Sequence, residues 1–262
     1  MSILRAYVSP QQSTPQKFLL LNSKESHHLI RVRRAQPGQL VQVFDGCGNE
    51  WKCQLEQADP TATRLCILSH HTVPLPPFSI TLGQALPKGK AWESIITKAT
   101  ELGISSLVPL GSTHSEIPIA TVQEVSKLQK WQALGIEACK QCGMSILPRI
   151  SRPQNFDHFI ETLPKQGIKG TLKLIASLEN DAVSLRSVFA DPTSFDLQIP
   201  LEAFWLIGPE GDFSPEEYSR ARNHGFIPID LGPNILRVDT AAIVALSLLL
   251  YELREYYKVA KK

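Results

Sequence analysis

Two segments near the carboxyl end of the chain repeat the same order of apolar and polar positions. Residues 203–207 form a short apolar run with two aromatic side chains, and residues 226–231 form a second short run that is apolar apart from Asp230. Runs of this length and composition are typical of buried strands. A glycine-containing loop follows each run, at residues 208–211 and 232–234. The pattern predicts two successive strand–loop–helix units, whose loops lie at the carboxyl ends of parallel strands.

The helix after the first loop carries a complete set of start signals. Ser214 is the predicted N-cap, Pro215 occupies the first helical position, and Glu217 is the third-position glutamate of a capping box. Gly225 is predicted to end the helix.

The helix after the second loop is unusually apolar. Asp239 or Thr240 is its predicted cap, and residues 241–250 contain one polar residue, Ser247. A helix that is apolar all round is buried, so we expect it to lie in the core or against another subunit.

The preceding part of the chain also alternates strands with helices. Strands are predicted at residues 79–82, ended by Gly83, at 105–110 and at 171–177. Helical periodicity covers residues 92–102 and 122–141. This alternation predicts an α/β domain with a parallel sheet.

The amino-terminal region has a different pattern. Strands are predicted at residues 40–44, 51–56 and 64–69, and residues 51–56 alternate with period two. Before them, residues 23–34 are predicted to form a helix capped by Ser23, with Leu29 and Val32 on one face. Three prolines within residues 74–77 make a stiff linker. We therefore expect a β-rich domain over residues 1–72 and an α/β domain over residues 77–262.

Composition narrows the class of protein. The 262 residues include 43% hydrophobic and 20% charged residues, as is ordinary for a globular protein. Five irregularly spaced cysteines, and no apolar run of about 18 residues, predict a reduced cytoplasmic compartment and no membrane span. Residues 1–72 carry eight basic and five acidic side chains, while the whole chain has a net charge of +2. This excess hints at an anionic partner.

Basic side chains cluster on the predicted amino-terminal helix. A solvated helix end and contact with RNA phosphates both remain open as interpretations of the cluster, which consists of His27, His28, Arg31, Arg33 and Arg34. A metal site is not expected, because adjacent histidines point to different helix faces and no carboxylate or thiol lies at ligand spacing. The two thiols of residues 139–142 are expected to be structural.

The two glycine loops favour one kind of ligand. The chain has no phosphate-binding Gly-x4-Gly-Lys-Ser/Thr motif, and no Gly-x-Gly-x-x-Gly at a strand–helix junction. Backbone-rich loops with few cations suit a ligand that contains adenine but no phosphate, such as S-adenosylmethionine. Three charged side chains lie beside the loops: Glu210, Arg237 and Asp239.

Two motifs at these loops resemble a known family. LIGPEGDFSPEE at residues 206–217 and LGPNILRVDTAA at residues 231–242 are similar to the RsmE family of ribosomal RNA uridine-N3 methyltransferases, within the SPOUT superfamily. The match extends upstream through residues 88–103 and 137–143, so it covers most of residues 80–250.

The resemblance implies a fold and a function. The fold would be an amino-terminal PUA-like β-barrel that binds RNA, followed by a SPOUT α/β domain with a deep trefoil knot. The function would be transfer of a methyl group from S-adenosylmethionine to N3 of a uridine in small-subunit (16S) ribosomal RNA. A homodimer with its active sites near the interface is also implied.

Carried over residue by residue, the resemblance implies three groups of site residues. The expected donor-binding residues are Leu178, Ile207, Gly208, Glu210, Gly211, Leu231, Gly232, Leu236 and Thr240. The expected RNA-binding residues are His28, Arg31, Arg33, Arg34, Lys88 and His114. Arg237 is the expected catalytic residue, because charge spreads to O2 and O4 of uracil once N3 loses its proton. Glu210 and Asp239 are candidates for the base or for orienting groups.

Three positions depart from the family pattern. His114 and Met144 stand where arginine is usual, and Asp239 replaces a glutamate. Loss of two positive charges leaves two further hypotheses open. One is a SPOUT methyltransferase that acts on another RNA position, and the other is an RNA-binding assembly factor without catalysis.

Overall fold

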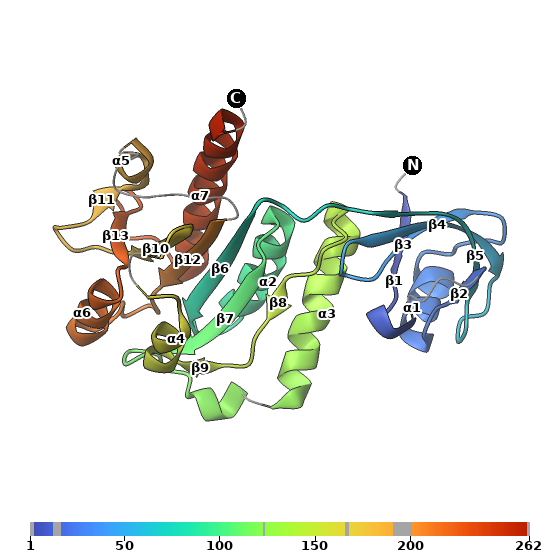
Figure 1. Ribbon diagram of the computed structural model, residues 1–262. Coiled ribbons are helices and arrows are strands. Elements are labelled where there is room, and N and C mark those ends of the chain that lie inside the picture. Colours follow the sequence, from blue (N-terminus) through green and yellow to red (C-terminus); the bar gives the residue numbers. More distant parts are fainter. Residues whose placement is uncertain (1–2, 13–16, 123, 166–167, 191–200, 261–262) are drawn as a thin grey trace. The chain divides into compact units, whose positions relative to one another are not determined.

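A computed structural model describes residues 3–12, 17–122, 124–165, 168–190 and 201–260 of the chain (Figure 1). The chain divides into two compact units. One contains Met1–Leu75 together with Ile136–Leu147, and the other contains Pro76–Gly135 and Pro148–Lys262. The sequence pattern predicts a connecting helix and loop over residues 181–200, of which residues 191–200 lie outside the described residues.

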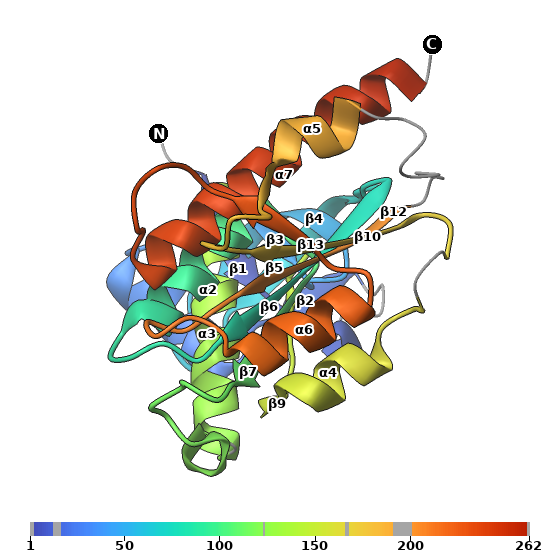
Figure 2. The same cartoon turned by 90° about the vertical axis from the view of Figure 1, so that its left-hand side faces the viewer.

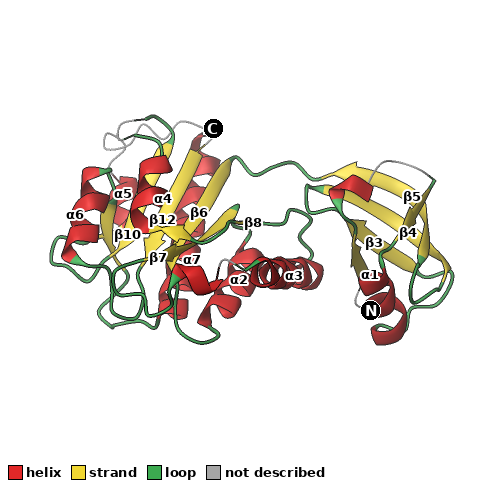
Figure 3. Cartoon of the chain, turned by 90° about the horizontal axis from the view of Figure 1, so that it is seen from below, coloured by secondary structure: helices red, strands yellow, loops and turns green. Residues whose placement is uncertain are grey.

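The second unit is built on a parallel sheet. Its strands are β6 (Phe78–Ala85), β7 (Ser106–Gly111), β8 (Arg149–Ile150), β9 (Gln154–Asn155), β10 (Thr171–Ala176), β11 (Val183–Ser184), β12 (Leu201–Ile207) and β13 (Ile227–Asp230). Their order is β11-β13-β10-β12-β6-β7-β8, with β9 beside β7, and every pair is parallel. Figure 3 shows β6, β10 and β12 side by side. The predicted α/β class with a parallel sheet is confirmed.

Helices cover both faces of this sheet. They are α2 (Ala91–Leu102), α3 (Val125–Cys142), α4 (Phe156–Thr162), α5 (Leu185–Ala190), α6 (Pro215–Asn223) and α7 (Val238–Ala260), with a short 3-10 turn at Ile119–Val122. Figure 2 shows α5 and α7 on one side of the sheet and α4 and α6 on the other. Successive side chains of β12 point to opposite faces of the sheet and so contribute to both helical layers. Trp205 packs with side chains of α2, α5 and α7, and Leu206 packs with those of α4 and α6.

Gly83 does not end its strand as predicted. It lies inside β6, where an added Cβ would come within 2.9 Å of side-chain atoms of both Leu206 and Phe159. The glycine therefore permits close packing in the middle of the sheet rather than a break.

Two helix starts also differ from the prediction. α7 begins at Val238, so Asp239 and Thr240 lie in its first turn, and the Ala241 amide donates to the carbonyl of Arg237 over 2.8 Å. α3 begins at Val125 rather than at residue 122, because the preceding residues form the 3-10 turn.

The apolar helix α7 is buried on one side only. Ala242, Ala245, Leu246 and Leu249 are fully buried, whereas Tyr251 is 64% exposed and Leu248 and Ser247 share its face. No helix among the described residues is long and apolar enough to cross a membrane.

The first unit is a mixed five-stranded sheet. It contains β1 (Leu4–Tyr7), β2 (Phe18–Leu20), β3 (Leu40–Phe44), β4 (Asn49–Gln57) and β5 (Arg64–Thr72), in the order β1-β3-β4-β5-β2. β1 runs parallel to β3, and the other pairs are antiparallel. The predicted alternation in β4 is confirmed, because Trp51, Cys53 and Leu55 are buried while Lys52 and Gln54 are exposed.

The helix predicted over residues 23–34 is shorter and changes its winding. α1 (Ser23–His27) is capped by Asn22 rather than Ser23, because the Asn22 side chain accepts a hydrogen bond from the Glu25 amide. A π-helical segment (His28–Val32) follows. The wider turn rotates later side chains away from the α-helical face. Leu29 is therefore buried, but Val32 is 60% exposed instead of sharing its face.

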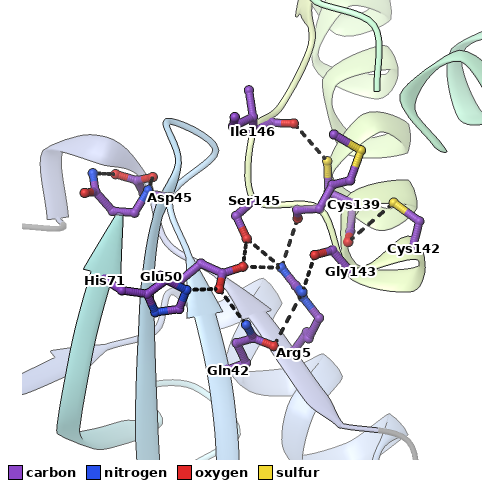
Figure 4. A network of polar contacts seen from close by, with 12 residues as sticks. Arg5, Gln42, Asp45, Glu50, His71, Cys139, Cys142, Gly143, Ser145 and Ile146 are labelled. Carbon is purple, nitrogen blue, oxygen red and sulfur yellow. Dashed lines mark hydrogen bonds and ion pairs between the residues drawn. The ribbon is translucent and has the colours of Figure 1, made fainter. Parts of the chain in front are cut away.

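A buried polar network joins the amino-terminal strands to Ile136–Leu147 within this first unit (Figure 4). The Arg5 guanidinium donates to the carbonyls of Gly143 and Met144 at 2.7 and 2.9 Å. It also forms an ion pair with Glu50, whose carboxylate accepts from Ser145 and Gln42. Because both ions are buried, removal of Glu50 would leave the Arg5 guanidinium without a carboxylate, whereas Glu50 also has His71 Nε2 at 2.7 Å.

Candidate functional site

One pocket of the second unit lies where the carboxyl ends of β10, β12 and β13 meet. It has a volume of about 300 Å³. Three segments line it: residues 176–178 after β10, the first glycine loop after β12, and residues 231–238 after β13. Because β10 lies between β12 and β13 in the sheet, the two glycine loops flank the end of one strand. This is the edge at which open α/β sheets bind ligands.

Gly208 and Asp212 set the shape of the first glycine loop. A Cβ at Gly208 would lie 2.9 Å from the Asp212 carboxylate and 3.2 Å from the Phe213 nitrogen, so a side chain there would force this turn to shift. Asp212 has a φ of 59°, which is uncommon for a residue with a side chain. Its carboxylate accepts a hydrogen bond from the Phe213 amide over 2.8 Å, which holds the turn.

Helix α6 anchors the end of this loop. The predicted capping box is confirmed, since Ser214 and Glu217 each accept a hydrogen bond from the other's backbone amide. One turn later, the Tyr218 hydroxyl donates to the Asp212 carboxylate at 2.9 Å and lies 3.1 Å from the Ala176 carbonyl. Burial, followed by the nearby Asp212 charge, raises the pKa of Tyr218, so the hydroxyl keeps its proton.

Two other segments contact the first glycine loop. The Glu210 carboxylate accepts a hydrogen bond from the backbone amide of Lys88 over 2.9 Å. The His114 ring lies 3.0 Å from the carbonyls of both Gly211 and Asp212 through Nδ1. The loop is thus held from outside the pocket.

The second glycine loop is more open. Gly232 has a φ of 120°, and its amide donates to the Asp230 carboxylate over 2.8 Å. Ile235 is 85% exposed at the rim of the pocket. The Arg237 side chain is exposed and forms no ion pair with any residue that the structure describes. A free guanidinium therefore stands at the edge of an otherwise mostly apolar pocket.

The chemistry of the lining suits an uncharged heterocycle with a small charged appendage. Seven of the expected donor-binding residues line the pocket: Leu178, Ile207, Gly208, Glu210, Leu231, Gly232 and Leu236. Apolar walls with a few placed polar groups are the usual lining of a small-molecule site. Glu210, Asp212 and Arg237 supply its charges. No stretch of the lining gathers the cations that a phosphate chain requires.

Two of the expected donor-binding residues are not among the residues that line the pocket. Gly211 faces His114, and Thr240 is exposed in the first turn of α7. The lining also includes residues that the motifs did not single out, notably Ala176, Ser177 and Asp212. A signal for Ala176 and Ser177 was available, since they end a buried strand beside Leu178.

The six expected RNA-binding residues lie in both units. In the first unit, Arg31, Arg33 and Arg34 are exposed on and just after the π-helical segment, and His28 Nδ1 lies 3.5 Å from Lys140. In the second unit, the Lys88 ammonium pairs with Glu116 at 2.6 Å, which raises the pKa of Lys88, and His114 contacts the first glycine loop.

The cysteines and acidic side chains form no metal-like cluster in the described part of the chain. There, no group of three or more histidine, cysteine, aspartate or glutamate side chains lies together. Within residues 139–142, Cys139 is buried and Cys142 exposed, and both are free thiols.

Two family models match the chain. One, described as an RNA methyltransferase domain, covers residues 74–250, which include both glycine loops. The other, described as an RNA methyltransferase PUA domain, covers residues 21–62.

Similar proteins carry one recurring name. Ribosomal RNA small subunit methyltransferase E of Synechocystis sp. is 34% identical over 245 residues, which cover 93% of this chain and 76% of that protein. The protein of the same name from Bacillus subtilis is 27% identical over 247 residues, covering 88% and 89%.

Similar solved structures contain a bound cofactor. A methyltransferase from Legionella pneumophila in complex with SAM has a TM-score of 0.82 and 31% identity, covering 95% of this chain and 97% of that one. Ribosomal RNA small subunit methyltransferase E from Neisseria gonorrhoeae, bound to S-adenosyl methionine, has a TM-score of 0.79 and 25% identity, covering 94% and 96%.

Proposed function

The chain belongs to the RNA methyltransferase family, and from this membership we propose that it transfers a methyl group from S-adenosylmethionine to N3 of a uridine in small-subunit ribosomal RNA. The observation that carries the proposal is the pocket between the two glycine loops. Seven residues that the family motifs assign to donor binding converge on it from three separate strands.

The pocket supports a division of roles in donor binding. Leu178, Ile207 and Leu231 offer apolar surface to an adenine ring, and Gly208 lets the backbone approach it. Because Glu210 is tied to the Lys88 amide, its carboxylate is best suited to anchoring the loop. When bound, S-adenosylmethionine supplies the electrophilic methyl group. The chain's own residues hold the donor, position the RNA base and assist its loss of a proton.

Arg237 is our candidate for stabilising the reacting uracil. Uracil N3 attacks poorly until it loses its proton, and the negative charge then spreads to O2 and O4. The exposed guanidinium at the pocket rim can donate to either oxygen. Its lack of an ion pair with any described residue leaves those donors available. Asp239 lies near it in the first turn of α7 and stays a candidate proton acceptor.

The exposed arginines of the first unit are our candidates for RNA backbone contact. Arg31, Arg33 and Arg34 lie within four residues on an exposed surface. Each guanidinium that neutralises a phosphate releases a counterion from the RNA, and this release favours binding. The target nucleotide must be unpaired or flipped, because N3 lies on the pairing edge of the base.

We also propose the assembly and the chain path that the family resemblance implies. The exposed Leu248 and Tyr251 on α7 support a homodimer formed through that face. A trefoil knot would involve the loops after β12 and β13, which flank the end of β10. A ribosomal substrate supports a cytoplasmic location.

The direct test uses small ribosomal subunits that lack the modification. We expect purified protein and labelled S-adenosylmethionine to incorporate label, and the digested RNA to yield 3-methyluridine. Label in another nucleoside would support a different target atom. Donor binding without incorporation on either naked RNA or assembled subunits would support the assembly factor instead.

A further inference from the structure

We infer that His114 is a positioning residue that clamps the first glycine loop in its donor-binding shape. The inference rests on the proposed function of the pocket, and it moves His114 from the RNA surface to the donor site. His114 is not among the residues that line the pocket, but its ring contacts the backbone of Gly211 and Asp212, and Glu210 and Asp212 both line the pocket.

The hydrogen-bond chemistry fixes the protonation of one ring nitrogen. Nδ1 of His114 lies 3.0 Å from the carbonyl oxygens of both Gly211 and Asp212. Carbonyl oxygens only accept hydrogen bonds, so Nδ1 must carry a hydrogen. The neutral ring with its proton on Nδ1 and the charged imidazolium both meet this requirement. The clamp therefore persists whether or not Nε2 is protonated.

The absence of a side chain at Gly211 allows His114 to lie close to the loop. A Cβ built on Gly211 would lie 3.2 Å from the Cβ of His114. A side chain at residue 211 would therefore require His114 to shift by a few tenths of an ångström, and we expect this shift to weaken its contact with the two carbonyls. This contact accounts for a glycine that belongs to the motif but does not line the pocket.

The backbone that carries His114 is itself fixed to helix α6. The Thr113 amide donates to one oxygen of Glu217 over 2.8 Å, and the other oxygen accepts from the Ser214 amide over 2.9 Å. Glu217 is only 5% exposed. The hydroxyls of Ser112 and Ser115 lie 2.8 Å apart and close the turn around His114. The ring therefore bridges two anchored segments, the end of β7 and the start of α6, across the glycine loop.

The test compares three His114 variants by calorimetry with S-adenosylmethionine. For H114A we expect the donor Kd to rise about 5- to 10-fold, the scale of a lost backbone contact. H114N should bind nearly as the wild type does, because its amide nitrogen is attached to Cγ as Nδ1 is. H114Q, whose nitrogen lies one bond further out, should not recover binding. H158A, at another exposed histidine of the same unit, is the control.

Two further readouts separate a clamp from an RNA contact and from general damage. The KM for RNA should stay unchanged in H114A, whereas a rise confined to that KM would overturn the clamp.

G211A should weaken donor binding as H114A does, and the double variant should be no weaker than either one, because both remove the same contact. Additive losses would contradict the inference. Hydrogen exchange of residues 208–214 should increase in H114A while the rest of the second unit keeps its protection.

The failure of the clamp can be told from failure of the proposed function. If the wild-type protein binds no S-adenosylmethionine, the function proposed for the pocket is wrong. If the wild type binds and H114A binds equally well, only the role of His114 is wrong.

Discussion

At the scale of single residues, the pocket is defined by backbone positions that few side chains can occupy. Gly208 makes room for the Asp212 carboxylate, and Asp212 itself adopts a left-handed conformation that its bonds to Phe213 and Tyr218 compensate. Backbone strain of this kind costs on the order of 1 kcal/mol or more and persists at functional sites. The motif predicted the glycines, but it did not reveal Asp212 as the residue that holds the turn.

Arg237 is expected to act on turnover rather than on donor binding. For R237A we expect S-adenosylmethionine affinity near that of the wild type, because the guanidinium stands at the rim, and turnover lower by about 10²-fold or more. Single-turnover methylation of small subunits measures the effect. R186A is the matched control, since Arg186 is exposed and pairs with Glu252 elsewhere on the unit. Turnover close to normal in R237A would remove Arg237 from the mechanism.

The two thiols of residues 139–142 are expected to differ sharply in reactivity. Burial, followed by the neighbouring Cys142, raises the pKa of Cys139 to about 12, whereas Cys142 is exposed. In the native protein at pH 8, iodoacetamide should therefore modify Cys142 about 10²-fold faster than Cys139, as peptide mass spectrometry would record. Comparable rates would contradict the burial of Cys139.

The same shift predicts the direction of one pH effect on stability. The folded state keeps the Cys139 proton at pH values where the unfolded state, with a pKa near 9.0, releases it. This contribution to the free energy of unfolding is fully present below pH 9 and is lost as the pH rises towards 12. In urea unfolding experiments, the free energy of unfolding of C139A should therefore decline less steeply with pH over that range than that of the wild type. The same slope in both proteins would contradict the raised pKa of Cys139.

At the scale of elements, the sequence predicts a helix boundary correctly where neighbouring residues alone determine it. The start of α6 could be predicted to the residue, because Ser214, Pro215 and Glu217 act on one another within a single turn. The start of α7 could not, because the helix begins at Val238, a buried core residue that lies before both predicted caps. The π-helical segment after His27 and the position of Gly83 inside β6 likewise depend on tertiary packing, which periodicity does not contain.

Removing the cap of α6 tests how firmly the first glycine loop is anchored. S214A should lower the free energy of unfolding by about 1 kcal/mol, the usual value for a lost N-cap. It should also weaken donor binding, because Tyr218 of this helix bonds to Asp212 at the end of the loop and Glu217 bonds to the Thr113 amide beside His114. S219A, at an exposed position of the same helix, is the control. Urea unfolding followed by circular dichroism would detect the change, and equal stability of the two variants would count against the anchor.

At the scale of the whole molecule, the sheet order explains why one pocket serves two distant motifs. β10 precedes β12 and β13 in the chain but lies between them, so loops about 20 residues apart converge on its end. The repeated strand–loop–helix pattern predicted parallel neighbours, and the family resemblance supplied the donor. Neither revealed that His114 would reach the first loop, because that contact joins residues 97 positions apart.

The exposed face of α7 predicts the state of assembly. Tyr251 and Leu248 are large, mostly apolar side chains on the face of α7 that is not buried in the core. We expect the wild type to elute as a dimer and Y251E to shift towards the monomer, because a charge in an apolar interface is costly. Sedimentation velocity at several concentrations measures this. A wild-type monomer at every concentration would contradict the proposed dimer.

Calorimetric titration of S-adenosylmethionine into the wild type and into G208A tests most directly whether the donor binds between the two glycine loops. We expect the wild type to bind one donor per chain. For G208A we expect a Kd at least 10-fold higher, because the new Cβ would meet the Asp212 carboxylate at 2.9 Å and the Phe213 nitrogen at 3.2 Å and open the loop. Thermal melting would verify that the variant is folded. Absence of binding by the wild type, or equal affinity in a folded G208A, would contradict a donor site between the two loops.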